Sequence, residues 1–236
     1  MITNSSKNLL KAILFDLDDT LWPIVPVILK AENALYEWIK INAPNVAKNY
    51  DLNSLRELRD SVAKKKPDLK LNLIELRKMS LIQAFKSSNS DISKVDNAMN
   101  VFLKTRNQVE LYDDVRSCLP KLKKKYKLGS ITNGGADLDE IEISKYFDIS
   151  ISAYKFGLAK PNPEIFLEAS KSLKLNPNLI AYVGDNLKLD VEGSQKAGFF
   201  GIWLNRFQKP VPIDCKHITP HATFNSLHSL ENWLKQ

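Results

Sequence analysis

AILFDLDDTL, residues 12–21, is the stretch that decides the fold of this 236-residue chain. Its first four residues are uniformly apolar, which is typical of a strand buried on both faces of a parallel sheet. Asp16 and Asp18 follow two positions apart, so an extended backbone points both carboxyl groups to the same side. Two acids this close repel each other unless a cation or a shared proton compensates them. Outside a wider pattern, such a pair is as often a turn or a cap as a catalytic site.

Strand-like and helix-like patterns alternate from Asp113 onward. Further strands are predicted at 128–132, 149–153, 179–183, 201–204 and 221–224. Helices are predicted at 115–125, 164–173, 191–197 and 227–234, and another is expected to open at the Asn133-Gly134-Gly135 turn. Alternation of this kind is typical of an α/β fold, a parallel sheet with helices on both faces.

Residues 26–110 contain no strand pattern and separate the first strand from the others. Apolar residues recur there at helical spacing, as in Leu55, Leu58 and Val62. Asn53-Ser54 and Ser90-Asp91 are plausible helix N-caps in this block. The block is therefore predicted to be an insertion: a catalytic core of residues 1–22 and 111–236 carries a helical cap of residues 23–110.

Composition and cysteine content indicate the cellular compartment in which the protein is expected to work. No apolar run approaches the roughly 20 residues of a membrane-spanning helix, and residues 1–16 lack the features of a secretory signal. Cys118 and Cys215 lie far apart without a Cys-x-x-Cys motif, which disfavours a disulfide framework or zinc site and makes the cytoplasm the expected compartment.

The net charge of +7 would suit a nucleic-acid partner. The lysines, however, occur in short runs such as 121–125 with few aromatic residues between them. This pattern favours solvated helix faces and attraction for small phosphorylated molecules over nucleic acid.

Polar residues follow several of the predicted strands, and the carboxyl ends of parallel strands form the edge where such sheets bind ligands. The candidates are Asp16, Asp18, Thr20, Thr132, Asn133, Lys160, Asp185 and Asp190. Carboxylates gathered at one edge suit a hard divalent cation, and oxygen ligands select Mg²⁺. One carboxylate could attack phosphorus while another acts as acid and base, and hydroxyl, amide and ammonium donors could hold a phosphoryl group. Taken singly, Lys160 could be a solvated loop lysine and Asp190 a helix cap.

Four motifs stand in order: DLDDT at 16–20, ITN at 131–133, KPNP at 160–163 and GDNLKLD at 184–190. With them the sequence resembles the haloacid dehalogenase-like hydrolases over nearly the whole chain. That resemblance implies a Rossmann-like, doubly wound core with an α-helical cap inserted after the first motif. It implies the following roles: Asp16 as nucleophile, Asp18 as general acid and base, and Thr132, Asn133 and Lys160 as phosphate-binding residues.

The same resemblance implies a Mg²⁺ site. Its ligands would be the carboxylates of Asp16 and Asp185 and the backbone carbonyl of Asp18. Asp190 would support the metal through water or hold Lys160 in place.

Asp18 distinguishes the activities of the family. Dehalogenases of this kind lack an acid there because their leaving group needs no proton, so Asp18 favours phosphomonoester hydrolysis through an aspartyl-phosphate. A Schiff-base lysine for phosphonate cleavage cannot be identified in the cap, and the cap contains no histidine for mutase chemistry. The rival from another class is a non-catalytic binding protein on the same fold, although no motif residue is missing.

A narrower resemblance bears on the substrate. Residues 16–32, 55–62 and 217–230 are similar to bacterial phosphatases of riboflavin metabolism, which implies FMN or 5-amino-6-(5-phospho-D-ribitylamino)uracil as substrate. Nucleotides and sugar phosphates remain alternatives. Trp22 would then either pack between cap and core or place its ring against an aromatic leaving group as a substrate contact.

Overall fold

The computed structural model describes residues 9–236, which divide into two compact units. The core unit comprises the chain up to Pro23 together with Glu110–Gly134 and Glu142–Gln236. The helical unit comprises Ile24–Val109 and Gly135–Ile141, a short segment that the sequence-based boundaries assigned to the core. Residues 1–8, the first half of the stretch judged not to be a secretory signal, lie outside the described residues.

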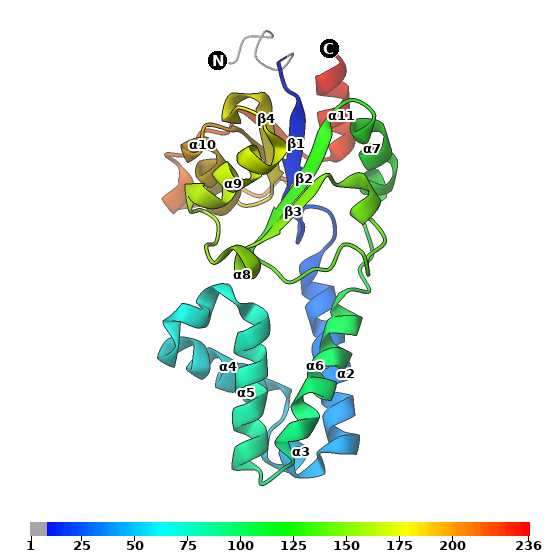
Figure 1. Cartoon of the computed structure of the whole chain (residues 1–236), viewed down its shortest axis with the longest axis vertical. Coiled ribbons are helices and arrows are strands. Elements are labelled where there is room, and N and C mark those ends of the chain that lie inside the picture. The colour runs from blue at the N-terminus through cyan, green and yellow to red at the C-terminus, as the bar shows by residue number, and fades with distance from the viewer. Residues whose placement is uncertain (1–8) are drawn as a thin grey trace. The chain divides into compact units, whose positions relative to one another are not determined.

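A parallel sheet, six-stranded within residues 9–236, forms the centre of the core unit (Figure 1). Its strands are β1 (Ala12–Phe15), β2 (Lys127–Thr132), β3 (Ile149–Ser152), β4 (Ile180–Gly184), β5 (Phe200–Leu204) and β6 (Ala222–Phe224). The spatial order is β3-β2-β1-β4-β5-β6, which is that of a doubly wound Rossmann-like sheet. The predicted α/β class is therefore confirmed, and the strand order reverses between β1 and β4, where such sheets bind ligands.

Helices cover both faces of this sheet: α9 (Pro163–Leu173) and α10 (Gly193–Lys196) on one, α7 (Asp113–Lys123) and α11 (Leu227–Lys235) on the other (Figure 1). A short helix, α8 (Ala153–Phe156), follows β3. Leu14 of β1 packs in one buried cluster with Phe166 of α9 and Tyr182 of β4. The rings of Phe166 and Tyr182 meet edge to face, with centroids 4.9 Å apart, so α9 is fixed directly over the central strands.

The helix predicted to open at Asn133-Gly134-Gly135 does not form. The chain instead turns, and the next helical turn is the short 3₁₀ segment Ser144–Tyr146. Two glycines weaken helix formation, and the Asp137 carboxylate accepts the backbone N–H groups of Asp139 (2.9 Å) and Glu140 (3.3 Å). These side-chain bonds close an alternative turn, which explains the failed prediction.

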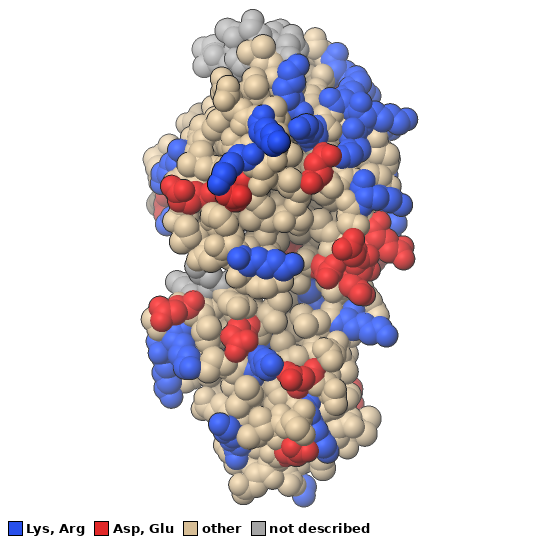
Figure 2. Space-filling view, in the orientation of Figure 1, with Lys and Arg blue, Asp and Glu red and all other residues tan. Residues whose placement is uncertain are grey.

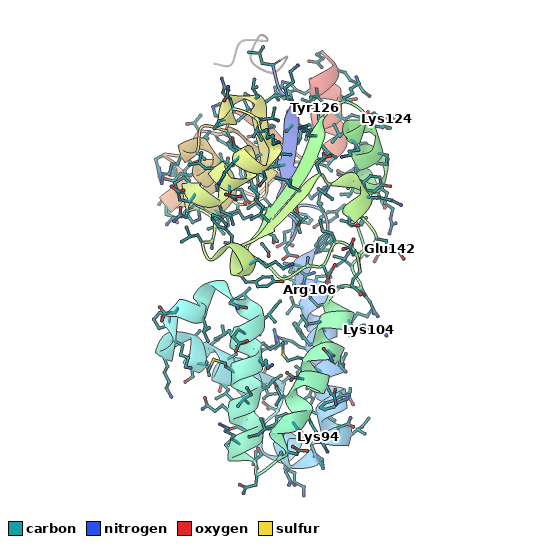
Figure 3. All side chains as sticks on the ribbon, viewed as in Figure 1. Lys94, Lys104, Arg106, Lys124, Tyr126 and Glu142 are labelled. Carbon is teal, nitrogen blue, oxygen red and sulfur yellow. The ribbon has the colours of Figure 1, made fainter. Side chains whose placement is uncertain are left out.

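Five α-helices form the helical unit in the described residues: α2 (Ile24–Asn42), α3 (Pro44–Asn49), α4 (Leu52–Lys65), α5 (Leu73–Ser87) and α6 (Val95–Arg106). Figure 3 follows α6 from Lys94 at its start to Arg106 at its end. The N-cap of α4 is Asp51, which forms a capping box with Ser54. The cap therefore lies two residues before the predicted Asn53. Nowhere in residues 9–236 does a helix reach the length and apolarity needed to cross a bilayer.

Basic side chains on the visible face of the core unit gather near α7 and α11 (Figure 2), where Figure 3 labels Lys124. Several of these charges are paired within the fold. Lys121 and Lys235 contact the buried Glu231 at 3.4 and 2.5 Å, and Lys123 lies 2.6 Å from Asp148. Several lysines of this basic surface therefore form ion pairs with acids of the core unit itself.

Glu32 of α2 is the main buried charge of the helical unit. Its carboxylate accepts hydrogen bonds from Arg56 (2.7 Å), Arg59 (2.9 Å) and Arg77 (3.2 Å). The Arg77 guanidinium also lies 3.8 Å from the centre of the Phe102 ring. Burial disfavours the charge of Glu32, yet the three arginines outweigh it and lower the pKa of Glu32. One carboxylate therefore joins α2, α4 and α5.

Replacing Glu32 by Gln should destabilise the helical unit by about 1–3 kcal/mol, because three arginines lose their counter-charge while two of them keep some solvent. Hydrogen exchange measured on peptides from α2 and α4 reports the stability of the helical unit separately from that of the core unit. The exposed Glu37→Gln, which breaks a surface pair with Lys40, is the matched control and should change stability by less than about 0.5 kcal/mol.

The two variants should also differ in their pH dependence. Because the folded pKa of Glu32 lies below its usual value of about 4.5, its stabilisation is complete above that pH and is lost as the pH falls further. Wild type and Glu37→Gln should lose protection of α2 in acid while Glu32→Gln changes less. Parallel profiles for all three proteins would contradict the role given to Glu32.

Candidate active site

The Lys160 ammonium lies at the centre of a buried cluster at the carboxyl end of the sheet. Its Nζ donates to Asp16 Oδ1 (2.6 Å), Asp190 Oδ1 (2.7 Å) and Tyr182 Oη (3.0 Å). These three bonds use all the donors of an ammonium group. The cluster joins the end of β1, strand β4 and the segment after β4, which are far apart in the sequence.

Backbone bonds explain how Asp16 and Lys160 reach their places. Asp16 directly follows β1, and its N–H extends the β1–β4 ladder to Val183 O at 2.9 Å. The side chain of Asn133 holds the backbone of Lys160 from both sides: Oδ1 accepts its N–H (2.9 Å) and Nδ2 donates to its carbonyl (3.0 Å). Of the phosphate-binding residues suggested by the sequence, Asn133 therefore has its side chain committed to Lys160.

Asp185 and Asp190 bring a second set of carboxylates to the same place. One oxygen from each of Asp16, Asp185 and Asp190 lies within 4.8 Å of the others. The Asp190 Oδ2 accepts the Asn186 N–H at 2.9 Å, so both oxygens of Asp190 have a protein partner. Gly184 is required beside it, since a methyl group there would lie 2.3 Å from the Asp190 carboxyl carbon.

Burial disfavours the charged forms of Asp16 and Asp185. Burial, together with the charges of Asp190 and Asp185, raises the pKa of Asp16 well above its usual range despite the opposing charge of Lys160. Burial and the nearby Asp190 and Asp19 raise the pKa of Asp185 to about 7. Lys160 has the opposite shift: burial opposes its charge, but Asp16 and Asp190 raise its pKa well above the usual value.

Three carboxylates beside one ammonium leave a deficit of positive charge. A hard divalent cation would remove it, and oxygen ligands are the ones such a cation prefers. Asp185 can offer a carboxylate oxygen for coordination, and Asp16 Oδ1 can offer the lone pair that Lys160 does not use, while both oxygens of Asp190 are occupied by Lys160 and Asn186. The residues present thus fit a divalent cation, with Asp190 in a supporting position.

Asp18 and Thr132 both lie close to Gly134. A methyl group at Gly134 would lie 2.3 Å from Asp18 Oδ2 and 3.3 Å from Thr132 Oγ1. The Thr132 hydroxyl accepts the Gly134 N–H at 2.9 Å, and Trp22 Nε1 donates to Asp18 Oδ1 at 2.9 Å. The structure therefore brings all the predicted site residues to one edge of the core unit, with Trp22 touching Asp18.

Two supporting residues were missed in the sequence. Tyr182 donates a hydrogen bond to Ile131 O at 2.7 Å and accepts one from Lys160. The sequence feature that could have identified it is a single tyrosine within an otherwise apolar strand. Arg206, after β5, donates to Thr20 O (3.0 Å) and to the buried Asp114 (2.9 Å). No sequence pattern singled out Arg206, because its partners come from distant segments.

Comparison with known proteins gives a consistent family and mixed activities. The family model for haloacid dehalogenase-like hydrolases matches residues 10–198. The chain is 28% identical to the 5-amino-6-(5-phospho-D-ribitylamino)uracil phosphatase YigB of Escherichia coli K12, over 94% of each protein. It is 29% identical to a glyceraldehyde 3-phosphate phosphatase of Methanopyrus kandleri, over 84% of this chain and 85% of that one. A 2-haloacid dehalogenase structure from Pseudomonas syringae is 33% identical with a TM-score of 0.88, covering 96% of this chain and 98% of that one.

If the acid cluster holds a divalent cation, Mg²⁺ should stabilise the protein against heat, by about 1.4 kcal/mol at ten times its dissociation constant. Asp185→Asn should lose most of this shift. Without metal, the same variant should be at least as stable as wild type at pH 8, because a buried charge is removed.

Asp60→Asn, a change at an exposed acid of α4, is the control and should respond to Mg²⁺ like wild type. An undiminished Mg²⁺ shift in Asp185→Asn would exclude Asp185 as a ligand. A loss of stability in that variant without metal would show a purely structural role instead.

Proposed function

The chain belongs to the haloacid dehalogenase-like hydrolases, and we propose that it is a Mg²⁺-dependent phosphomonoester hydrolase that works through an aspartyl-phosphate at Asp16. The observation that carries this proposal is the Asp16 carboxylate bound by the buried Lys160, together with Asp18 beside Thr132 and Gly134. Relatives named as phosphatases support the reaction class.

Asp16 has one oxygen held firmly and one held weakly. Oδ1 accepts from Lys160 at 2.6 Å, whereas Oδ2 has a long 3.4 Å contact from the Thr20 hydroxyl. The weakly held oxygen is the one free to attack phosphorus and form the acyl phosphate. Once Asp16 is phosphorylated, its carboxylate loses its charge, so Lys160 can direct one N–H donor to the phosphoryl oxygens.

Asp18 would act twice. Its proton passes to the ester oxygen as the phosphorus–oxygen bond breaks, and the ionised carboxylate then takes a proton from the water that hydrolyses the aspartyl-phosphate. Donors from Lys160 and the Thr132–Gly134 turn would hold the phosphoryl oxygens. When bound, the divalent cation would neutralise charge between the phosphoryl group and the carboxylates of Asp16 and Asp185, with the Asp18 carbonyl as a further ligand.

Dehalogenation is the second candidate, because the Pseudomonas syringae relative is named a dehalogenase. In that reaction a carboxylate attacks carbon and a halide leaves without a proton. Asp18, whose Oδ2 faces Gly134, would then have no task. The presence of this acid therefore favours phosphate ester hydrolysis.

For the substrate, we favour FMN or 5-amino-6-(5-phospho-D-ribitylamino)uracil, supported by the similarity to the Escherichia coli enzyme over nearly the whole chain. A nucleotide or sugar phosphate is the alternative, since other relatives carry such names. The expected compartment is the cytoplasm, in keeping with the free, buried thiols of Cys118 and Cys215.

Asp16→Asn should lower Mg²⁺-dependent hydrolysis of p-nitrophenyl phosphate by at least about 1000-fold, because the nucleophile is removed. Circular dichroism should show an unchanged fold. Asp60→Asn, at an exposed acid of α4, should keep wild-type activity. Retained turnover in Asp16→Asn would exclude the aspartyl-phosphate route.

A phosphate-release panel should identify the substrate class: FMN, the riboflavin precursor, nucleotides and sugar phosphates, with 2-chloropropionate as the test for dehalogenation. We expect the highest kcat/KM for one of the first two and no halide release. Preference for a small sugar phosphate would reject the riboflavin assignment, and halide release would reject the reaction class.

A further inference from the structure

The loop that follows β1 closes on itself within six residues. Leu21 N donates to Leu17 O and Asp19 N donates to Trp22 O, both at 2.7 Å. Asp19 takes a left-handed backbone conformation, with φ of 61°, which lets the chain return. As a result, the side chain of Trp22 lies against Asp18, four residues earlier, and its Nε1 donates to Asp18 Oδ1 at 2.9 Å.

An indole N–H can donate a hydrogen bond but cannot accept one. Asp18 Oδ1 must therefore be the accepting oxygen in this contact. The other oxygen of the Asp18 carboxyl group is Oδ2. This second oxygen lies beside Gly134, at the end of β2, where Thr132 also points its hydroxyl. The bond thus fixes the orientation of the Asp18 carboxyl group and, with it, the place of Oδ2.

Burial makes the contact stronger than a surface hydrogen bond. The Trp22 side chain is fully buried, so its N–H cannot turn to water without leaving an unsatisfied donor. Any large apolar ring could fill the space that Trp22 occupies. The short, correctly directed bond to a carboxylate is what packing does not require.

We propose that Trp22 is a positioning residue for Asp18: its indole N–H holds Oδ1 so that Oδ2 faces the leaving-group oxygen. The inference rests on the proposed phosphatase function and adds a residue to it. It differs from the hypothesis of a direct substrate contact, because Trp22 acts through Asp18. The effect should appear only when the leaving group needs a proton.

Trp22→Phe tests this, because phenylalanine keeps a buried aromatic ring but has no N–H. With glycerol phosphate, whose alkoxide is a poor leaving group, kcat/KM should fall by about 10- to 100-fold. With p-nitrophenyl phosphate, whose phenolate leaves without protonation, it should fall by no more than about threefold. The ratio of the two values within one preparation is independent of the fraction of folded enzyme.

Two further variants complete the experiment. Trp233→Phe makes the same change in α11 and should leave both rates and their ratio unchanged. In an Asp18→Asn background, Trp22→Phe should change the ratio no further, because the two residues act as a unit.

Each other outcome overturns the proposal. Equal losses on both substrates would show a structural role for Trp22. A loss confined to aromatic substrates, p-nitrophenyl phosphate and FMN, would place the ring against the leaving group. If wild type hydrolyses neither phosphate ester, the proposed function fails first.

Discussion

The structure of the site depends on one buried ammonium group, that of Lys160, shared between Asp16 and Asp190. Burial of carboxylates without a neighbouring cation would cost several kcal/mol each. Tyr182 fills the third donor position of Lys160 and Asn133 holds its backbone. The surrounding fold therefore holds the Lys160 ammonium group through three side chains and holds its backbone through Asn133.

Sheet topology explains why such distant residues meet. The central strand β1 has β2 on one side and β4 on the other, and their carboxyl ends lie at the point where the strand order reverses. Asp16 leaves β1, Thr132 ends β2 and Asp185 leaves β4. These three groups leave rigid strand ends, so backbone hydrogen bonds fix their separations. Lys160 comes from the segment before α9, where Asn133 holds its backbone.

Much of this could be predicted from the sequence, because uniformly apolar runs are a strong signal for buried parallel strands. The end of every predicted strand agrees with the structure within one residue. The failures have local causes: side-chain bonds from Asp137 replaced the helix expected after Gly135, and Asp51 took the cap expected at Asn53. Tyr182 as a partner of Lys160 depends on three-dimensional neighbours that no spacing pattern encodes.

The contact of Trp22 with Asp18 could not be predicted from the sequence either, although the two residues lie in one turn. The sequence predicted either packing or a substrate contact, but the bond to Asp18 exists only because Asp19 accepts a left-handed conformation. Arg206 holds the same loop from β5 through Thr20 O, so the loop is fixed on both sides of Asp19. A chain that released a halide would gain nothing from an indole N–H directed at this acid. The support given to Asp18, more than the acid itself, is thus the structural argument that its proton is used.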